Sequence, residues 1–460
     1  MEKIKHLYWR AGFGLSPTEW QQKREWPISK AIDELFTQAR QAQVALPMAE
    51  MGLPEDMEKK RENRELFEQV LREEKRRIFE YNVNWVYRMA NPKESALLER
   101  MTFFWHGHFA CKPDFGKLSM QYLNTLRKHA LGNFKDMLLA VAQDPAMIRY
   151  LNNQQNRKEK PNENFARELM ELFTLGRGKY SEKDIKEAAR AFTGWSSDLR
   201  GDYLFRPFWH DYGSKTFFGK TGNFDGADII NIILERPETA QFIVRKVYKH
   251  FVNEQVDEAV VSTLSKQFYQ SGYDIGKLMR SIFSSEWFYA PQNMGNRIKS
   301  PIEFTAGLMR TVDMKFDQPM GMLFIQRALG QILFNPPNVA GWPGGKTWID
   351  NSTLMLRLNL PGYLFNATEF SLRTKGEFED EMREKGGRRL SNTLNMGPLS
   401  GSIKGSSAND IAAELSKYLL STQPALPIES YTKELAATDR ESIIRQMTLR
   451  LMTLPEYQLC

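Results

Sequence analysis

Residues 160–195, KPNENFARELMELFTLGRGKYSEKDIKEAARAFTGW, constrain the fold more than any other stretch, because they predict two helices joined by a short turn. Apolar residues recur at three- and four-residue intervals from about 162 to 175, as they do along the buried face of a helix. A glycine then follows and gives this helix a C-terminal stop. Ser181 precedes Asp184 in a pattern similar to a capping box, which predicts a second helix up to about residue 193.

The first of these helices carries more polar side chains than a core requires. Glu163 lies one helical turn from Arg167, and Asn164 lies one turn from Glu168. Such a group can form the floor of a binding or catalytic site. It can equally be the solvated face of a well-capped helix. Both interpretations stay open at this point.

Helical periodicity covers most of the remaining chain, and 42% hydrophobic residues in 460 are ample for a large core. We therefore predict a mainly α protein, a multi-helix globular domain with a small β and aromatic loop element near residues 200–220. Residues 1–376 are expected to form one large helical domain. Residues 377–408 are rich in Gly and Ser and predict a flexible connection. Residues 409–460 predict a small C-terminal helical extension that packs on the main domain.

The charge and the apolar pattern argue against a nucleic-acid partner and against a membrane-spanning segment. The net charge of +7 comes from 63 basic and 56 acidic residues spread along the chain, so nucleic-acid binding is not indicated. No apolar run approaches the roughly 18 residues of a membrane helix, and we expect no membrane span. The first ten residues have no room for the apolar core of a signal peptide, which predicts a cytoplasmic protein. Export together with a partner stays open.

Two histidines in the segment WHGHF form a candidate metal site. His106 and His108 would lie about 200° apart on a helix, so they can hold one ion only if the helix ends near Gly107. The alternative is a pair of core or hydrogen-bonding histidines. Cys111 follows, but a structural zinc site needs more thiolates than the chain supplies nearby.

A second polar group lies in the aromatic segment DYLFRPFWHDYGSKTFFG. His210, Asp211 and Lys215 stand among aromatic residues that can shift their pKa values. They either belong to a site or brace the loop by hydrogen bonds.

The segment AGWPGGKT, residues 340–347, satisfies the loose pattern of a phosphate-binding loop. The residues before it, NPPNV, cannot pair as a central strand, because proline lacks the amide donor. Trp342 and Pro343 also fill positions where backbone amides would surround a phosphate. We expect no nucleotide cofactor.

Several motifs together resemble one bacterial family, the domain-of-unknown-function 1800 family. The motifs are HLYWRAGFGLSPTEW, MTFFWHGHF, the 160–195 stretch, HDYGSKTFFG, KSPIEF and GQILFNPPNVAGWPGGKTWID. The resemblance implies that certain polar and aromatic positions belong to the family pattern, namely Arg10, His106, His108, Asn162, Glu163, Asn164, Arg167, Glu168, Arg190, Trp195, His210, Asp211, Lys215 and Trp342. It also implies a partner similar to sulfatase or alkaline-phosphatase-fold proteins, and frequent export.

Polar motifs on separate segments favour one shared pocket over several braced loops. The combination of histidines, a glutamate and a His-Asp pair is best explained by a divalent transition metal such as zinc, iron or manganese. The metal would activate a bound water while a carboxylate moves protons. We predict His106, His108, His210 and Asp211 as metal ligands, Glu163, Arg167, Glu168 and Lys215 as catalytic residues, and Arg10, Asn162, Asn164, Arg190, Trp195 and Trp342 as substrate-binding residues. The leading hypothesis is a metal-dependent hydrolase. The alternatives are a metal-dependent oxidoreductase and a non-enzymatic peptide- or glycan-binding or maturation partner protein.

Overall fold

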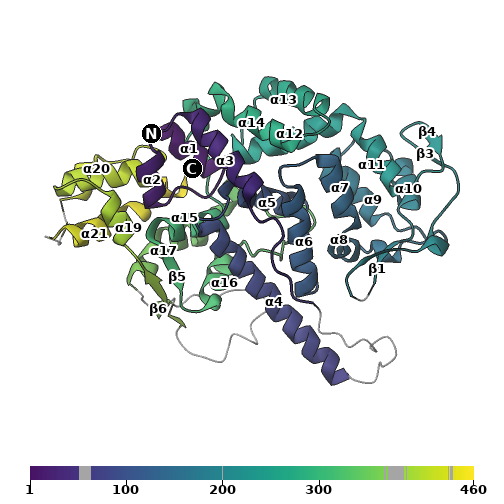
Figure 1. Cartoon of the computed structure of the whole chain (residues 1–460), viewed down its shortest axis with the longest axis horizontal. Coiled ribbons are helices and arrows are strands. Elements are labelled where there is room, and N and C mark those ends of the chain that lie inside the picture. The colour runs from purple at the N-terminus through teal and green to yellow at the C-terminus, as the bar shows by residue number, and fades with distance from the viewer. Residues whose placement is uncertain are drawn as a thin grey trace.

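Helices make up 62% of the residues that the structure, a computed structural model, describes (Figure 1). The structure describes residues 1–50, 64–198, 200–366, 369–370, 388–389, 391–433, 435 and 439–460. In these ranges there are 20 α-helices and four two-stranded antiparallel sheets. The mainly α prediction is confirmed.

The α-helices are α1 (Glu2–Arg10), α2 (Pro17–Lys23), α3 (Ile28–Gln41), α4 (Arg64–Ala90), α5 (Ala96–His108), α6 (Gly116–His129), α7 (Phe134–Gln143), α8 (Pro145–Tyr150), α9 (Asn164–Glu168), α10 (Glu182–Ala191), α11 (Gly226–Leu234), α12 (Pro237–Phe251), α13 (Glu258–Gln270), α14 (Ile275–Ser284), α15 (Pro301–Val312), α16 (Pro319–Ala328), α17 (Asn351–Asn366), α19 (Gly397–Ser402), α20 (Ala408–Leu419) and α21 (Arg440–Met452). The strands are β1 (Trp195–Ser197), β2 (Tyr203–Phe205), β3 (Lys215–Phe217), β4 (Lys220–Gly222), β5 (Met314–Phe316), β6 (Glu369–Phe370), β7 (Arg388–Arg389) and β8 (Asn392–Leu394).

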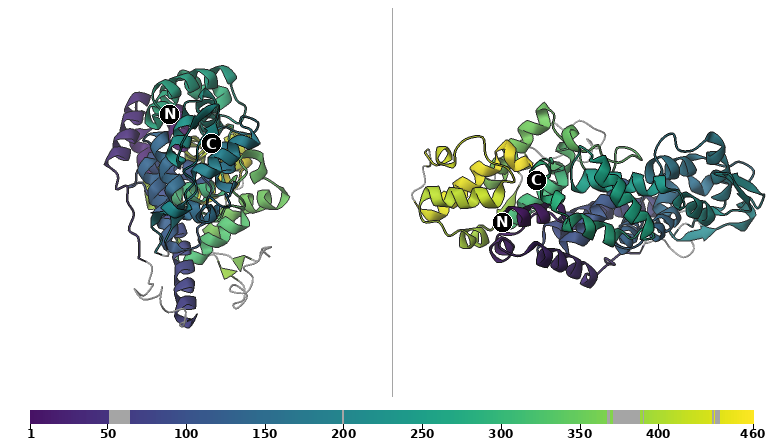
Figure 2. Two further views of the ribbon diagram at one scale, coloured as in Figure 1. Left: turned by 90° about the vertical axis from the view of Figure 1, so that its right-hand side faces the viewer. Right: turned by 90° about the horizontal axis from the view of Figure 1, so that it is seen from above.

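The molecule is elongated, with the middle of the chain at one end and the C-terminal helices at the other. Figure 1 shows α9 to α11 and β1 to β4 at the end opposite α20 and α21, and the view from above in Figure 2 agrees. Helices α5, α12 and α15 lie between these ends. No helix in the described ranges is both long and apolar enough to cross a bilayer.

Local capping signals explain where several helices begin. The Ser16 hydroxyl accepts from the Glu19 amide, while the Glu19 carboxylate accepts from the Ser16 amide, so α2 begins with a complete capping box. Ser181 and Asp184 form the same reciprocal pair at the start of α10, as the sequence predicted. Such a cap satisfies amides that have no partner within the helix.

The first helix of the 160–195 stretch is less regular than predicted. It begins as α9 and continues from Leu169 to Thr174 as η2, a π-helical turn with a wider hydrogen-bond spacing. The amides of Leu175 and Gly176 both donate to the Met170 carbonyl. The carbonyls of Leu172 and Phe173 are left facing other elements, where they accept from side chains described below.

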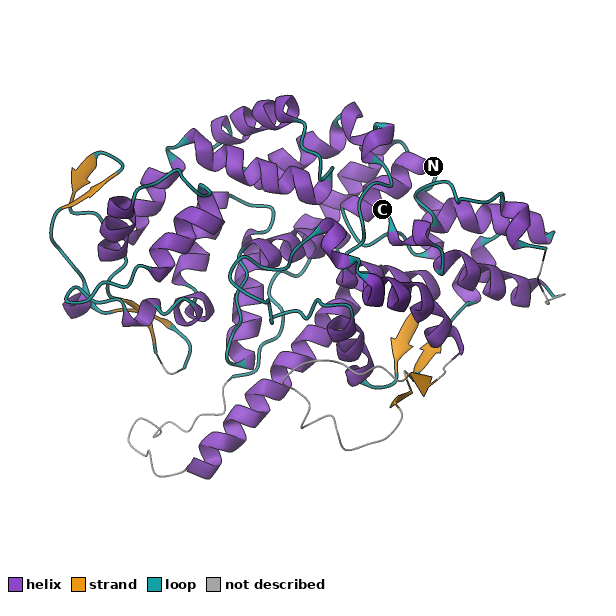
Figure 3. Ribbon diagram, turned by 180° about the vertical axis from the view of Figure 1, so that it is seen from behind, coloured by secondary structure: helices purple, strands orange, loops and turns teal. Residues whose placement is uncertain are grey.

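The strands gather in two places, as Figure 3 shows. β1 pairs with β2 and β3 with β4, which confirms the β element predicted near residues 200–220. β5 pairs with β8 and β6 with β7, and these two sheets were not predicted. Part of the predicted flexible connection, 377–408, lies outside the described residues. Of the rest, β8 pairs with β5, and α19 buries Leu399.

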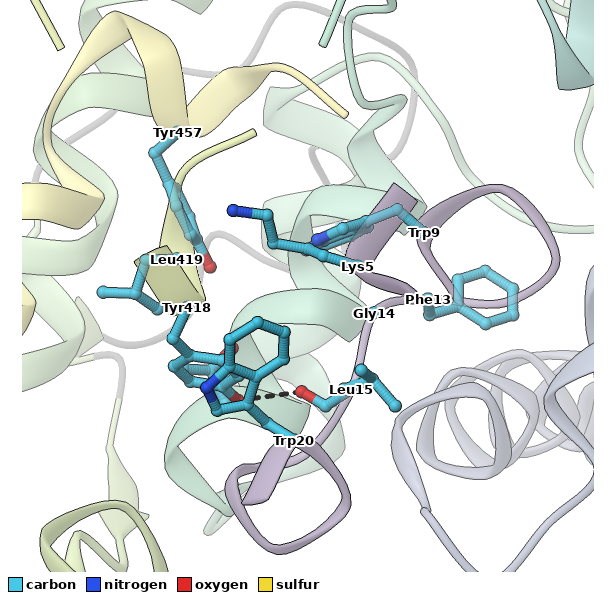
Figure 4. A pocket seen from close by; sticks show the side chains of 10 residues that line it. Lys5, Trp9, Phe13, Gly14, Leu15, Trp20, Tyr418, Leu419 and Tyr457 are labelled. Carbon is cyan, nitrogen blue, oxygen red and sulfur yellow. Dashed lines mark hydrogen bonds between the residues drawn. The ribbon is translucent and has the colours of Figure 1, made fainter. Parts of the chain in front are cut away.

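The C-terminal helices pack directly against the start of the chain (Figure 4). The Tyr418 hydroxyl donates to the Leu15 carbonyl at 2.8 Å, and its ring lies 5.8 Å from that of Trp20. Lys5 Nζ donates to the Lys417 carbonyl at 2.7 Å, in the last turn of α20. A cation in that position also meets the negative end of the helix dipole. The space between these residues holds only about 10 Å³, so this contact is a packed interface and no ligand site.

Candidate functional site

A cleft of about 520 Å³ lies between α5, the end of α12 and the loop of residues 340–348. It also touches the segment that leads into α15. Its aromatic wall consists of Phe103, Phe104, Trp342 and Trp348. These elements come from four distant parts of the sequence, and tertiary packing brings them together.

Gly107 lines the cleft, and its missing side chain leaves open space there. The helix α5 includes Gly107 and ends at His108, one residue later, so its end lies near Gly107 as expected but His106 and His108 are both still helical. A Cβ atom at Gly107 would meet nothing within 4 Å, whereas one at Gly341 would lie 2.5 Å from the Gly107 carbonyl oxygen. Gly341 also has a φ of +83°, which favours glycine. The 340–348 loop therefore lies directly on α5, beside open space above Gly107.

His106 lies behind the cleft wall and is a packing residue. Its ring stacks on Trp342 with a centroid distance of 5.3 Å and an interplanar angle of 18°. Its Nε2 accepts from the Phe334 amide at 3.3 Å. Burial lowers the pKa of His106 to about 3. The imidazole is therefore neutral, and the lone pair that a metal would need is already used.

His108 lines the cleft and is held in one tautomer. Its Nε2 donates to the Phe173 carbonyl at 3.1 Å, one of the carbonyls left facing outward by the π-helical turn. Its Nδ1 is buried, and none of the described residues offers it a hydrogen-bond partner. Burial, together with Lys246, lowers the pKa of His108 well below its usual value. His108 thus presents a neutral ring with an unused acceptor.

His250, on the last turn of α12, was missed by the sequence interpretation. It lines the cleft with its ring 5.0 Å from that of Phe104. In the described part of the chain, no group hydrogen-bonds to its buried Nε2. Burial lowers the pKa of His250 well below its usual value, and the charges of Arg297 and Arg100 add to the effect. A second neutral imidazole therefore faces the same space.

The floor of the cleft is a buried ion cluster centred on Glu303. Arg297, which lines the cleft, donates from Nη1 and Nη2 to the two carboxylate oxygens of Glu303 at 2.7 and 3.0 Å. Arg100 pairs with the same carboxylate from a fully buried position. Burial alone would raise the pKa of Glu303, but Arg100 and Arg297 hold it well below its usual range. Two cations on one carboxylate leave the floor with excess positive charge.

The rim of the cleft adds two lysines and one carboxylate. Lys246 donates to the Leu172 carbonyl at 3.0 Å, and burial lowers its pKa to about 8. Lys249 is exposed and directly precedes His250 in the last turn of α12. The exposed Glu254 lies so close to Gly345 that a Cβ there would be 1.9 Å from Glu254 Oε1. Cations therefore outnumber carboxylates around the opening.

Five of the predicted site residues brace the aromatic end of the molecule. Arg190 donates to Asp211 at 2.7 Å, and His210 Nδ1 donates to the Thr193 carbonyl at 2.8 Å. Lys215 Nζ donates to the Asp211 carbonyl at 2.6 Å. The fifth, Trp195, lies in β1 and packs its ring at 5.8 Å from Tyr203. These contacts fix the loops around β1 to β4, and they do not face the cleft.

The polar residues of the 160–195 helix form surface pairs. Arg167 donates to Glu182 at 2.9 Å and to Glu163 at 3.2 Å. Pairs of this kind contribute about 0–1 kcal/mol to stability. Glu168 is half-buried. Its pKa is raised mainly by burial and further by the negative charge of Glu171.

The remaining predicted residues have structural partners. The Asn162 amide donates to Asn156 Oδ1 at 2.8 Å, and the Asn164 side chain donates to the Leu151 carbonyl at 3.1 Å. Arg10 is fully buried and donates to the carbonyl of Asn293 at 3.1 Å. Burial lowers the pKa of Arg10 to about 10.

Of the predicted site residues, only His108 and Trp342 line the cleft. The four predicted metal ligands do not form one cluster, because within the described ranges no group of three or more His, Cys, Asp or Glu is placed to hold a metal ion. The reason is geometric. His106 and His108 point to different neighbours from one continuous helix, while His210 and Asp211 belong to the braced loops at the far end.

The fold and cleft define a mainly helical protein with an aromatic cleft that carries more cations than carboxylates. A family model for proteins of unknown function, DUF1800, matches residues 6–459, so the chain belongs to that family. The match includes the C-terminal helices, beyond the motifs quoted from the sequence. No curated protein and no solved structure matches the chain.

Proposed function

We propose that the chain is a binding protein whose cleft takes an acidic saccharide. The observation that carries this proposal is a cleft of about 520 Å³ in which tryptophan side chains lie beside cations. Its volume is within the range of about 300–1,000 Å³ that holds small ligands. The non-enzymatic, glycan-binding alternative of the sequence interpretation fits this geometry best.

The aromatic wall suits the flat, weakly polar face of a sugar ring. One face of Trp342 is covered by His106, and this contact fixes the indole in place. Trp342 also lines the cleft, so its remaining surface is available to a ligand. A rigid aromatic surface loses little conformational entropy when it binds.

The charges favour an acidic sugar over a neutral one. Arg297 and Lys249 supply donors for a carboxylate or sulfate group, and charge-assisted hydrogen bonds are about twice as strong as neutral ones. Arg297 already shares Glu303 with Arg100, so the floor retains a positive field. The carboxylate of Glu254 at the rim can accept hydrogen bonds from the hydroxyl groups of the sugar.

Isothermal titration calorimetry with oligogalacturonides and with their methyl esters tests the proposal. The two ligands share their ring faces and differ in charge, so the acidic form is expected to bind and the ester to bind about tenfold more weakly. Lys249→Gln should weaken binding of the acid by a similar factor. Lys277→Gln, which removes a cation outside the cleft, is the control. Equal affinity for acid and ester, or binding of acidic peptides alone, would count against an acidic saccharide.

The other predicted functions find no support in the described geometry. A metal-dependent hydrolase and a metal-dependent oxidoreductase both need the ligand set that the fold separates. They stay predictions, as does a partner of sulfatase or alkaline-phosphatase fold.

A further inference from the structure

The far end of the molecule exposes a group of large apolar side chains that no cleft or core explains. Phe208 is 88% exposed and Tyr212 is 59% exposed, on a segment that also contains β2. All three residues of β2, Tyr203, Leu204 and Phe205, are 37–39% exposed. Apolar groups gathered in this way mark interaction surfaces far more often than scattered single residues do.

We call these exposed side chains, which all lie within residues 203–212, the aromatic tip. The rings of Phe205 and Tyr212 both contact His210, at centroid distances of 5.4 and 4.7 Å. Phe208 lies between them in the chain, in the short helix Pro207–Trp209. The tip is rigid, because the contacts of Arg190 and Lys215 with Asp211 brace it from behind.

A basic loop adjoins the aromatic tip. The Lys158 amide donates to the Trp209 carbonyl at 2.8 Å, and the Arg157 guanidinium lies 3.8 Å above the Trp209 ring. The Arg206 guanidinium lies 4.6 Å from the centroid of the same ring. Lys160 is also exposed in this loop. The same segments hold three carboxylates, Glu159, Asp198 and Asp202, besides Asp211, which pairs with Arg190. Five cations stand against those three, so the surface keeps a positive excess.

We propose that the aromatic tip docks onto an anionic lipid surface. Phe208 projects from the protein rather than lining a hollow, and a projecting phenyl ring suits insertion among lipid chains. Tyrosine and tryptophan rings favour the level of the headgroups, and adjacent lysines and arginines are attracted to anionic lipids. The tip would hold the molecule by one end, with the cleft free.

The test is co-sedimentation of the full chain with vesicles. The chain is expected to pellet with vesicles of phosphatidylcholine and phosphatidylglycerol, to pellet less with phosphatidylcholine alone, and to be released by salt. Phe208→Ser should weaken binding about tenfold, because Phe208 is the most exposed apolar side chain of the tip and its ring would no longer be transferred from water into lipid. Replacing both Lys158 and Lys160 by Glu should remove the preference for phosphatidylglycerol.

Met355→Ser is the matched control, since Met355 is 59% exposed on α17, away from the tip. It should leave vesicle binding unchanged. Phe208→Ser should leave affinity for oligogalacturonides unchanged, which separates this proposal from the cleft. The proposal is overturned if the chain stays in the supernatant with anionic vesicles at low salt, or if Phe208→Ser binds them like the unaltered chain. It is also overturned if sedimentation velocity shows a dimer that Phe208→Ser dissociates while vesicles are ignored.

Discussion

The imidazole of His106 lies flat against the indole of Trp342, with their ring planes 18° apart. This contact makes a buried histidine the support of a cleft wall. The Phe334 amide fixes the imidazole from the other side by donating to Nε2. The position of Trp342 therefore depends on a side chain that never reaches the ligand space.

Replacing His106 by Ala should destabilise the fold by about 2–4 kcal/mol. The change leaves a cavity and also leaves the Phe334 amide without its acceptor. Urea unfolding measures the effect, with His129→Ala at a half-buried position expected to cost less. A variant with unchanged stability that loses a stoichiometric metal would instead establish the predicted metal centre.

Glu303→Gln should cost about 3–5 kcal/mol, because it leaves Arg100 and Arg297 buried without their shared carboxylate. The midpoint of urea unfolding reports the loss. Glu254→Gln is the matched control, since Glu254 is exposed and its replacement should stay within about 0.5 kcal/mol. Similar midpoints for the two variants would show that the ion cluster contributes little.

Stability should fall as the pH drops below about 6.5. The folded-state pKa values of His6, His106, His108 and His250 are all lowered by burial, to about 3 for His106. The unfolded chain then binds more protons, so the stability that these groups contribute is present above about pH 6.5 and is lost toward pH 3. Asp144 acts in the opposite sense, because burial raises its pKa to about 7.

The pH dependence has a direct check in single histidine variants. His106→Gln removes one titrating group, so the slope of the unfolding free energy should decrease by up to about 1.4 kcal/mol per pH unit as the pH falls from 6.5 to 5. His129→Gln should change the slope less, because His129 is only half-buried. An unchanged slope in His106→Gln would mean that the pKa of His106 is the same in the folded and the unfolded chain.

Lys5→Met should loosen the C-terminal helices. Lys5 Nζ donates to carbonyls in the last turn of α20, and its loss leaves them without a donor. We expect a cost of about 1–3 kcal/mol and faster amide hydrogen exchange in α20. Lys3→Met, at an exposed position of the same helix, is the control. Equal exchange in both variants would mean that the rings of Trp20 and Tyr418 hold this interface without help.

Most of the helical fold could be predicted because its signals are local. The capping boxes that begin at Ser16 and Ser181 each span only four residues. The apolar residues that follow each cap recur at helical spacing, which is also visible over a short stretch of sequence. The pairing of β5 with β8 could not be predicted in this way. Its strands are three residues long and lie about 80 positions apart, so only tertiary contacts define them.

The cleft was predicted only in part, for a related reason. His108 and Trp342 stand in conspicuous motifs, whereas His250 ends an ordinary amphipathic helix and carries no local signal. The Arg297 and Glu303 pair had a weak signal, a capping box at Ser300 preceded by a basic residue. Arg190 and Asp211 also stand in a conspicuous polar pattern, and in the structure they pair with each other and brace loops. Sequence alone does not distinguish a polar residue that binds a ligand from one that binds its own backbone.

Filling the space above Gly107 tests the central claim, that the cleft is the ligand site, most directly. Gly107→Ala and Gly107→Leu should both fold and gain up to about 1 kcal/mol, because Gly107 is helical and a Cβ there meets nothing within 4 Å. Calorimetry with oligogalacturonides should then show near-normal affinity for Gly107→Ala and at least about tenfold weaker binding for Gly107→Leu, whose side chain occupies the cleft. Equal affinity in the two folded variants would contradict the account.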